Sequence, residues 1–174
     1  MVKRYAYVSV RNNTSSPVHN VSVIHKYSDV YRSKEIWPTI QSEELAEDKM
    51  LVNYNTGFLT TGHDWWLIMW VNNEGNTLYY SHPHNFRDIL DKIERLGNGI
   101  LKSLSKLEGG ESGQAMREAA QLILNQEGTA GFKQHMLESD DNDKLTEIVI
   151  NSDYTITFKS HSGTSNTVTA TKEL

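Results

Sequence analysis

The sequence contains no cysteine among its 174 residues. Disulfide bonds, thiolate metal ligands and a cysteine nucleophile are therefore excluded. The N-terminus passes directly from Met1 into alternating polar and apolar residues, without the apolar run of a signal peptide. We expect a cytoplasmic protein, or one that is released without a signal peptide.

Basic residues are also scarce, with 17 Lys and Arg against 22 Asp and Glu, which gives a formal net charge of -5. Binding to a phosphate backbone depends on clustered Lys and Arg, so we expect no nucleic-acid partner. The mean hydropathy of -0.55 is that of a water-soluble chain and not of a membrane-spanning one.

The usual motifs of catalysis and cofactor binding are missing as well. The glycines at 97, 99, 109 and 110 fall in or between predicted helices, and not in a phosphate-binding loop after a strand. His63 and Asp64 have the order of a base and its orienting carboxylate, but no serine lies in a nucleophile elbow beside them. We predict a protein that is not an enzyme and that uses no cofactor.

What the sequence does contain is a series of short alternating segments, which is the pattern of half-buried β-strands. We predict a mainly β protein, an antiparallel β-sandwich of seven or eight short strands. The segments at 5–10 and 19–27 are expected to form a hairpin, and residues 28–49 a long surface connection. Later strands are predicted at 50–54, 65–71, 77–81, 145–150, 154–159 and 168–172.

The segment 65–71 is the most apolar of the chain, and as a strand it would be apolar on both faces. We therefore predict that it is a central strand, joined to 77–81 by a hairpin turn at Asn72–Asn76. One face would carry Trp65, Leu67, Met69 and Val71, and the other Trp66, Ile68 and Trp70.

The pattern changes between residues 86 and 126, where apolar residues recur every three or four positions. Gly109 and Gly110 divide this region into two amphipathic helices. We predict a helical hairpin at 86–126, inserted into a single β-sandwich domain that spans residues 1–174.

Aromatic residues gather on the two strands of the predicted hairpin at 65–81. Such residues either fill a core or line a site for carbohydrate, lipid or protein. The candidate ligand or partner surface consists of Trp65, Trp66, Trp70, Tyr79 and Tyr80.

Metal binding has only weak candidates. His82 and His84 are separated by one residue, so both imidazoles could face one ion, but no third ligand is evident nearby. The acidic run at 140–143 lacks the spacing and the central glycine of an EF-hand loop, and a solvated turn is the better interpretation. We predict no metal site.

Several separated segments resemble one protein family. They are YAYVSVRNN at 5–13, VIHKYSDV at 23–30, TTGHDWWLIMW at 60–70, GFKQHML at 131–137 and FKSHSGTSNTV at 158–168. Together they are similar to the PUD family, small proteins named for their up-regulation in long-lived nematodes with reduced insulin signalling, with relatives among fungi. The resemblance implies a β-sandwich, a tendency to form dimers and no known catalytic activity. It is least evident at 86–126.

We therefore expect a non-enzymatic binding or interaction protein that forms a homodimer or heterodimer. The alternative is a membrane-active, pore-forming or insecticidal defence protein, in which the aromatic sheet recognises a lipid membrane or a glycan and the helices rearrange. Glycine hinges favour this alternative, whereas the balanced charges on the helices speak against it.

Overall fold

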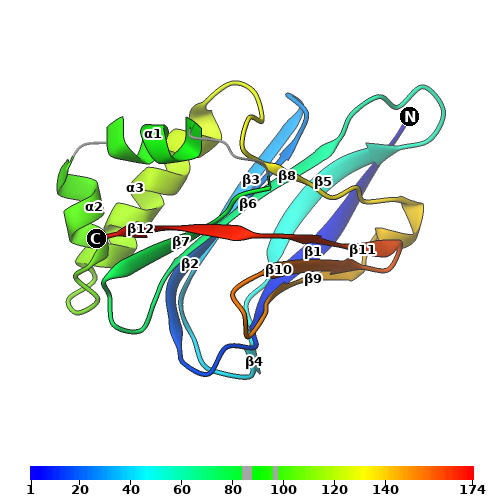
Figure 1. The fold of residues 1–174 in the computed structure, drawn as a ribbon. Helices are drawn as coiled ribbons and strands as arrows, with labels where there is room; N and C mark the ends of the chain where they lie inside the picture. The colour runs from blue at the N-terminus through cyan, green and yellow to red at the C-terminus, as the bar shows by residue number, and fades with distance from the viewer. Residues whose placement is uncertain (84–87, 96–97) are drawn as a thin grey trace.

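The protein folds into two six-stranded β-sheets that pack face to face, with helices on one side (Figure 1). The computed structural model describes residues 1–83, 88–95 and 98–174. Sheet A contains β1 (Val2–Asn12), β4 (Glu44–Leu45), β5 (Met50–Thr56), β9 (Leu145–Ile150), β10 (Ile156–Ser160) and β11 (Gly163–Thr167). Sheet B contains β2 (Val18–Tyr27), β3 (Tyr31–Ile40), β6 (Asp64–Val71), β7 (Thr77–Ser81), β8 (Lys133–Gln134) and β12 (Thr169–Glu173). The predicted mainly β sandwich is confirmed.

The first two strands do not form the predicted hairpin, because β1 belongs to sheet A and β2 to sheet B. β1 pairs with β5 in antiparallel and with β9 in parallel orientation. The connection after β1 is held by Asn12, whose side-chain amide donates to the carbonyl oxygens of Ser16 at 2.8 Å and Ile40 at 3.0 Å. These hydrogen bonds stabilise a connection that carries the chain from sheet A to sheet B, where a hairpin would need a tight turn.

The prediction of a long surface connection at 28–49 was also wrong. β3 occupies ten of these residues and pairs along its length with β2, from Tyr27 opposite Tyr31 to Val18 opposite Ile40. β3 is the last strand of sheet B on its side, so most of its side chains are half-buried or exposed. An edge strand of this kind lacks the strong apolar alternation that reveals a strand in sequence.

The central position predicted for residues 65–71 is confirmed, because β6 is flanked by β2 on one side and by β7 and β8 on the other. Its two faces enter two different cores. Trp66, Ile68 and Trp70 are buried between the sheets, while Leu67, Met69 and Val71 are buried on the other face of sheet B.

That second face is covered by α1 (Asp88–Arg95), α2 (Asn98–Leu104) and α3 (Glu111–Asn125), which lie together on sheet B in Figure 1. Ile93, Leu104, Met116 and Ile123 supply the apolar contacts from the helices. α3 agrees with the second predicted helix. The first falls on α1, α2 and residues outside the described part. The assignment of 86–126 as an insertion in one domain stays a prediction.

None of the helices in the described part of the chain is long and apolar enough to cross a bilayer.

Candidate functional site

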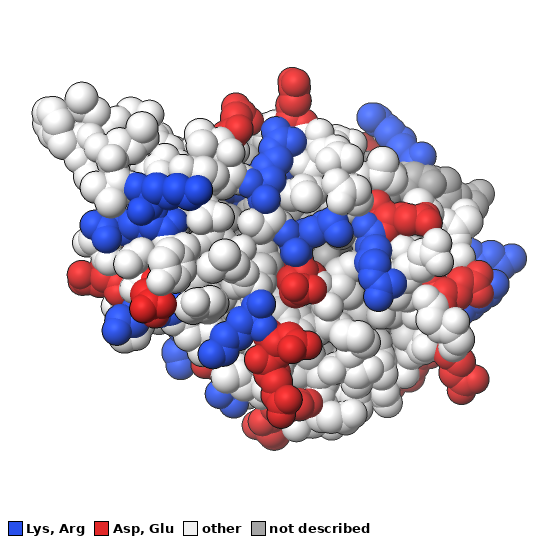
Figure 2. All heavy atoms as spheres, turned by 180° about the vertical axis from the view of Figure 1, so that it is seen from behind, with Lys and Arg blue, Asp and Glu red and all other residues white. Residues whose placement is uncertain are grey.

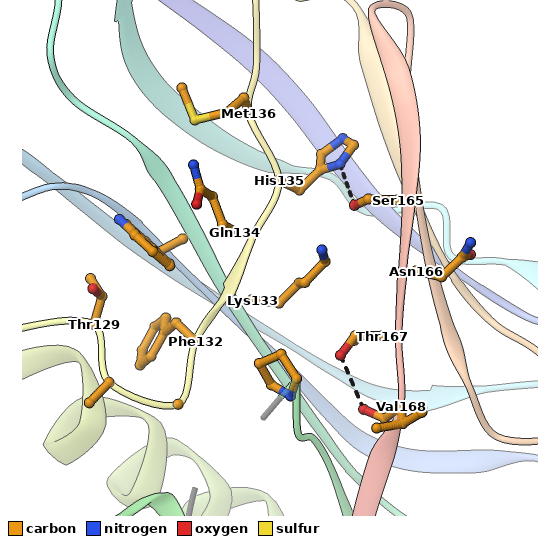
Figure 3. Close-up of a pocket in the computed structure, with 14 residues that line it drawn as sticks. Thr129, Phe132, Lys133, Gln134, His135, Met136, Ser165, Asn166, Thr167 and Val168 are labelled. Carbon is orange, nitrogen blue, oxygen red and sulfur yellow. Dashed lines mark hydrogen bonds between the residues drawn. The ribbon is translucent and has the colours of Figure 1, made fainter. Parts of the chain in front are cut away.

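A groove of about 860 Å³ lies where residues 129–136 face the junction between β11 and β12 (Figure 3). Trp65, Phe132 and Met136 give it apolar surface, and Figure 3 shows Lys133 projecting into the space between the two walls. We call it the Trp65 groove. Its lining residues are Trp65, Pro83, 129–136 and 165–168.

The first wall is β8, a two-residue strand that pairs with β6. Gln134 lies opposite Trp65, and the amide of the next residue, His135, donates to the carbonyl oxygen of Asp64 at 3.2 Å. Because hydrogen-bonded and non-hydrogen-bonded pairs alternate in antiparallel strands, the backbone N–H and C=O of Gln134 point away from β6. This edge of β8 therefore offers a main-chain donor and acceptor.

The second wall is the corner at which the chain leaves sheet A and enters sheet B. β11 pairs with β10 and is the terminal strand of sheet A, and β12 pairs with β7 as the terminal strand of sheet B. The carbonyl oxygen of Val168, between the two strands, accepts a hydrogen bond of 2.8 Å from the amide of His82. The groove is thus bordered by strand edges on both sides.

A buried lysine holds the first wall in place. The ammonium of Lys26, on β2, donates to the carbonyl oxygens of Gln126 at 2.6 Å and Gly128 at 3.1 Å. It also lies 5.0 Å from the centroid of the Phe132 ring. These contacts join the end of α3 and the start of the wall to the sheet. The alternation within 19–27 did not predict burial of Lys26, since an isolated lysine there indicates an exposed position.

The charge of the groove is controlled by Lys133 and the buried His135 behind it. Burial lowers the pKa of Lys133. Burial, and then the positive charge of Lys133, lowers the pKa of His135, although Asp141 and Asp64 act in the opposite direction. The imidazole of His135 is therefore uncharged at neutral pH, and the side-chain nitrogen of Lys133 is partly removed from water.

His135 bonds to serine hydroxyls through both ring nitrogens, at 2.7 Å to Ser165 and 2.9 Å to Ser160. Ser160 contacts Ser162, which donates to the carboxylate of Asp141. Among the described residues no carboxylate contacts the imidazole of His135, so the orienting group of a serine–histidine catalytic triad is missing here.

Asp64 pairs with His25 and not with the neighbouring His63. Its carboxylate lies 2.7 Å from Nε2 of His25 and accepts the backbone N–H of Leu137 at 2.9 Å. His63 is exposed, and its ring lies against Trp65 with centroids 6.3 Å apart. His63 and Asp64, although adjacent in sequence, thus lie in different environments: His63 at the surface and Asp64 in the core.

The five aromatic candidates do not form one surface. Trp66 and Trp70 are fully buried between the sheets and Tyr80 is buried under the helices, so these three are corrected from surface to core. Tyr79 is half-buried and stacks on Trp70 with centroids 5.1 Å apart. Trp65 is the member that lines the groove. The alternation of side chains along a strand explains this division, since adjacent residues on β6 and on β7 face opposite sides of the sheet.

The residues considered as metal ligands do not form a metal-binding cluster in the described part of the chain. His82 is half-buried and its ring lies edge-on to Tyr80, with centroids 5.9 Å apart, while His84 lies outside the described residues. In the acidic run, Asp141 is buried and accepts hydrogen bonds from the backbone of Glu138 and from Ser162. Across the described residues, no group of three His, Asp or Glu side chains is placed to hold a metal ion.

Comparison with known protein families finds a match to this sequence. The family model described as "Up-Regulated in long-lived daf-2" matches residues 2–169. The chain belongs to the PUD family. The match includes all residues that line the Trp65 groove and all strands of both sheets except β12, of which it reaches only Thr169. No curated protein matches the chain.

Proposed function

We propose that this PUD-family protein works by binding and not by catalysis, and that the Trp65 groove takes an extended polypeptide segment of a partner protein. The observation that carries the proposal is the outward edge of β8, where the backbone of Gln134 points away from β6. An extended peptide can add to such an edge as a further strand, so that main-chain hydrogen bonds supply affinity and neighbouring pockets supply selectivity.

The side chains around that edge suit this mode of binding. Trp65 and Met136, both half-buried, provide apolar contacts for side chains of a bound strand. The ammonium of Lys133 would favour a carbonyl oxygen or a carboxylate on the peptide, because burial has already removed part of its hydration. No cofactor is required for binding of this kind.

A substitution at Gln134 tests main-chain recognition directly. Gln134→Pro removes the N–H that points away from β6, whereas Gln134→Ala keeps it and removes only the side chain. The full chain would be panned against a phage-displayed library of random peptides, and the selected peptides measured by calorimetry against both variants. We expect the proline variant to lose binding and the alanine variant to keep it.

Two other outcomes would contradict the proposal. Equal binding to both variants would show that side chains and not the strand edge hold the peptide. Failure to select any peptide, together with binding to immobilised glycans that Trp65→Ala abolishes, would assign the groove to carbohydrate.

Self-association is a second candidate, favoured by the uncovered face of sheet A. Tyr5 and Tyr7 on β1 are exposed and pack edge to face with centroids 5.9 Å apart, and Leu51 lies opposite Tyr7 on β5. Tyrosine is enriched at protein interfaces. We propose that a second copy, or a related chain, covers this patch to form a dimer.

Light scattering over a range of protein concentrations tests the dimer. The wild type should have twice the monomer mass, and Tyr5→Ser/Tyr7→Ser should shift it to the monomer. Leu122→Ser, an exposed position on α3, is the matched control and should keep the wild-type mass. A wild type that is monomeric at every concentration would exclude this candidate.

The alternative of a membrane-active toxin that uses the aromatic sheet and the helices gains no support from the packing. Trp66 and Trp70 are enclosed between the sheets, and Ile93, Leu104 and Met116 face sheet B.

A further inference from the structure

An uncharged apolar tip projects from the end of the sandwich, at the connection between β5 and β6. Phe58 is 85% exposed and Leu59 80% exposed, the highest values among the large hydrophobic side chains described. Figure 2 shows this end as a projection free of Lys, Arg, Asp and Glu, in its upper left. Adjacent large apolar side chains exposed at a projecting end often mark a site of contact with a membrane or a partner.

The backbone of the tip holds these side chains in place. Leu59 has φ +67°, a left-handed conformation that is uncommon for a bulky residue, and Gly57 has φ +101°. The amide of Thr60 donates to the carbonyl oxygen of Gly57 at 3.2 Å and closes the turn. Local strain retained at an exposed position is typical of functional segments.

The N-terminal strand extends the apolar surface and adds positive charge beside it. Val2 lies opposite Thr56, directly before the tip, and is 49% exposed. The next two residues along β1 are Lys3 and Arg4, and Arg4 donates to the hydroxyl of Thr56. In Figure 2, basic side chains gather just below the projection.

We propose that the tip, made of Phe58 and Leu59 with Val2, inserts into the interfacial layer of a lipid bilayer that contains anionic lipids. Lys3 and Arg4 then lie at the level of the headgroups. Apolar insertion combined with electrostatic attraction is the usual basis of reversible binding to a membrane surface. The inference is independent of the Trp65 groove, because it uses none of the groove's residues.

Charge and area favour a bilayer over a protein partner. A stable protein interface requires about 800 Å² on each partner, and one convex tip built on two large side chains offers far less. A bilayer needs no complementary pocket and accepts a convex apolar projection. Since the chain carries a net charge of -5, attraction to anionic lipid has to be local. The placement of Lys3 and Arg4 next to the tip supplies that local charge.

Vesicle co-sedimentation of the full chain tests the proposal. The probes are vesicles of phosphatidylcholine alone and of phosphatidylcholine mixed with phosphatidylserine. We expect binding to the mixed vesicles, reduced about tenfold or more by Phe58→Ser/Leu59→Ser. Lys3→Gln removes one positive charge, so it should weaken binding to the mixed vesicles and have a smaller effect on any binding to vesicles of phosphatidylcholine alone. Leu122→Ser makes the same kind of change at another exposed position and should bind as the wild type does.

The other outcomes each overturn the proposal. Wild type that sediments with neither vesicle excludes a lipid surface. Wild-type binding by the double variant places membrane contact elsewhere. A tip-dependent increase in mass without lipid, seen by light scattering, assigns the tip to a second copy. Phe58→Ser alone repeats the test should the double variant fail to fold.

Discussion

The imidazole of His25 and the carboxylate of Asp64 lie 2.7 Å apart, and neither side chain has any exposed surface. One ring nitrogen of His25 faces the carboxylate, and its ring packs against Trp66 with centroids 4.4 Å apart. The second carboxylate oxygen accepts the backbone N–H of Leu137. This pair therefore joins β2, β6 and the segment that follows β8.

Replacement of Asp64 should be strongly destabilising. Asp64→Ala leaves the ring of His25 and the amide of Leu137 buried without a partner, and we expect it to lower the free energy of unfolding by about 3–5 kcal/mol. Asp64→Asn keeps one acceptor and should cost less, about 1–3 kcal/mol. Urea unfolding measures both. Asp140→Ala, at an exposed position, should stay within about 0.5 kcal/mol of the wild type.

The neighbours Trp65 and Trp66 should respond in opposite ways. Trp66 is fully buried, so Trp66→Ala should cost about 3–5 kcal/mol of stability. Trp65 lines the groove and is only half-buried, so Trp65→Ala should cost markedly less but abolish binding of groove peptides. Calorimetric unfolding and peptide titration separate the two effects. Equal losses of stability would contradict the assignment of Trp65 to the groove.

Stability should fall as the pH is lowered below the ordinary histidine pKa of about 6.5. Burial and the charge of Lys133 lower the pKa of His135 in the folded state. In that range the unfolded chain takes up a proton that the folded chain does not bind, so protonation favours unfolding. Urea unfolding at several pH values between 7 and 5, which bracket the ordinary histidine pKa, measures how steeply the free energy of unfolding changes with pH. His135→Asn should have a smaller slope, and an unchanged slope would contradict the role assigned to His135.

Gly62 sets how closely the base of the apolar tip approaches Tyr27. A Cβ atom at Gly62 would collide with the ring of Tyr27, which is buried. We expect Gly62→Ala to cost about 1–3 kcal/mol, because an overpacked site has to shift its neighbours. Gly163→Ala is the control, since a Cβ atom there meets no atom within 4 Å. Thermal unfolding compares the two, and equal midpoints would show that the loop relaxes without cost.

Much of the fold could be predicted from periodicity. The two-sided apolar run at 65–71 predicted a central strand, because only a strand covered on both faces can bury both sets of side chains. The separate burial of Trp66 and Leu67 on opposite faces of β6 agrees with that reasoning. The strands that pair with β1 could not be predicted. The turn residues near Asn12 are equally compatible with a hairpin and with a connection that crosses from one sheet to the other.

The groove was largely beyond prediction. Of its lining, Trp65 was a candidate, but Lys133, Gln134 and Ser165 were not, because they come together only through pairing of distant segments. The burial of Lys26 follows from carbonyl oxygens near the end of α3, a hundred residues away. No local pattern encodes such a contact.

The parallel pairing of β1 with β9 has a consequence for synthesis of the chain. Tyr7 lies opposite Leu145 and Asn12 opposite Ile150, so this edge of β1 has its native partner only after residues 145–150 have left the ribosome, long after β1 itself. Until then β1 exposes unpaired backbone groups, which favour aggregation. Strands β2, β3, β6 and β7 are all synthesised before β9. We expect nascent chains that stop before residue 150 to depend on chaperones to protect β1.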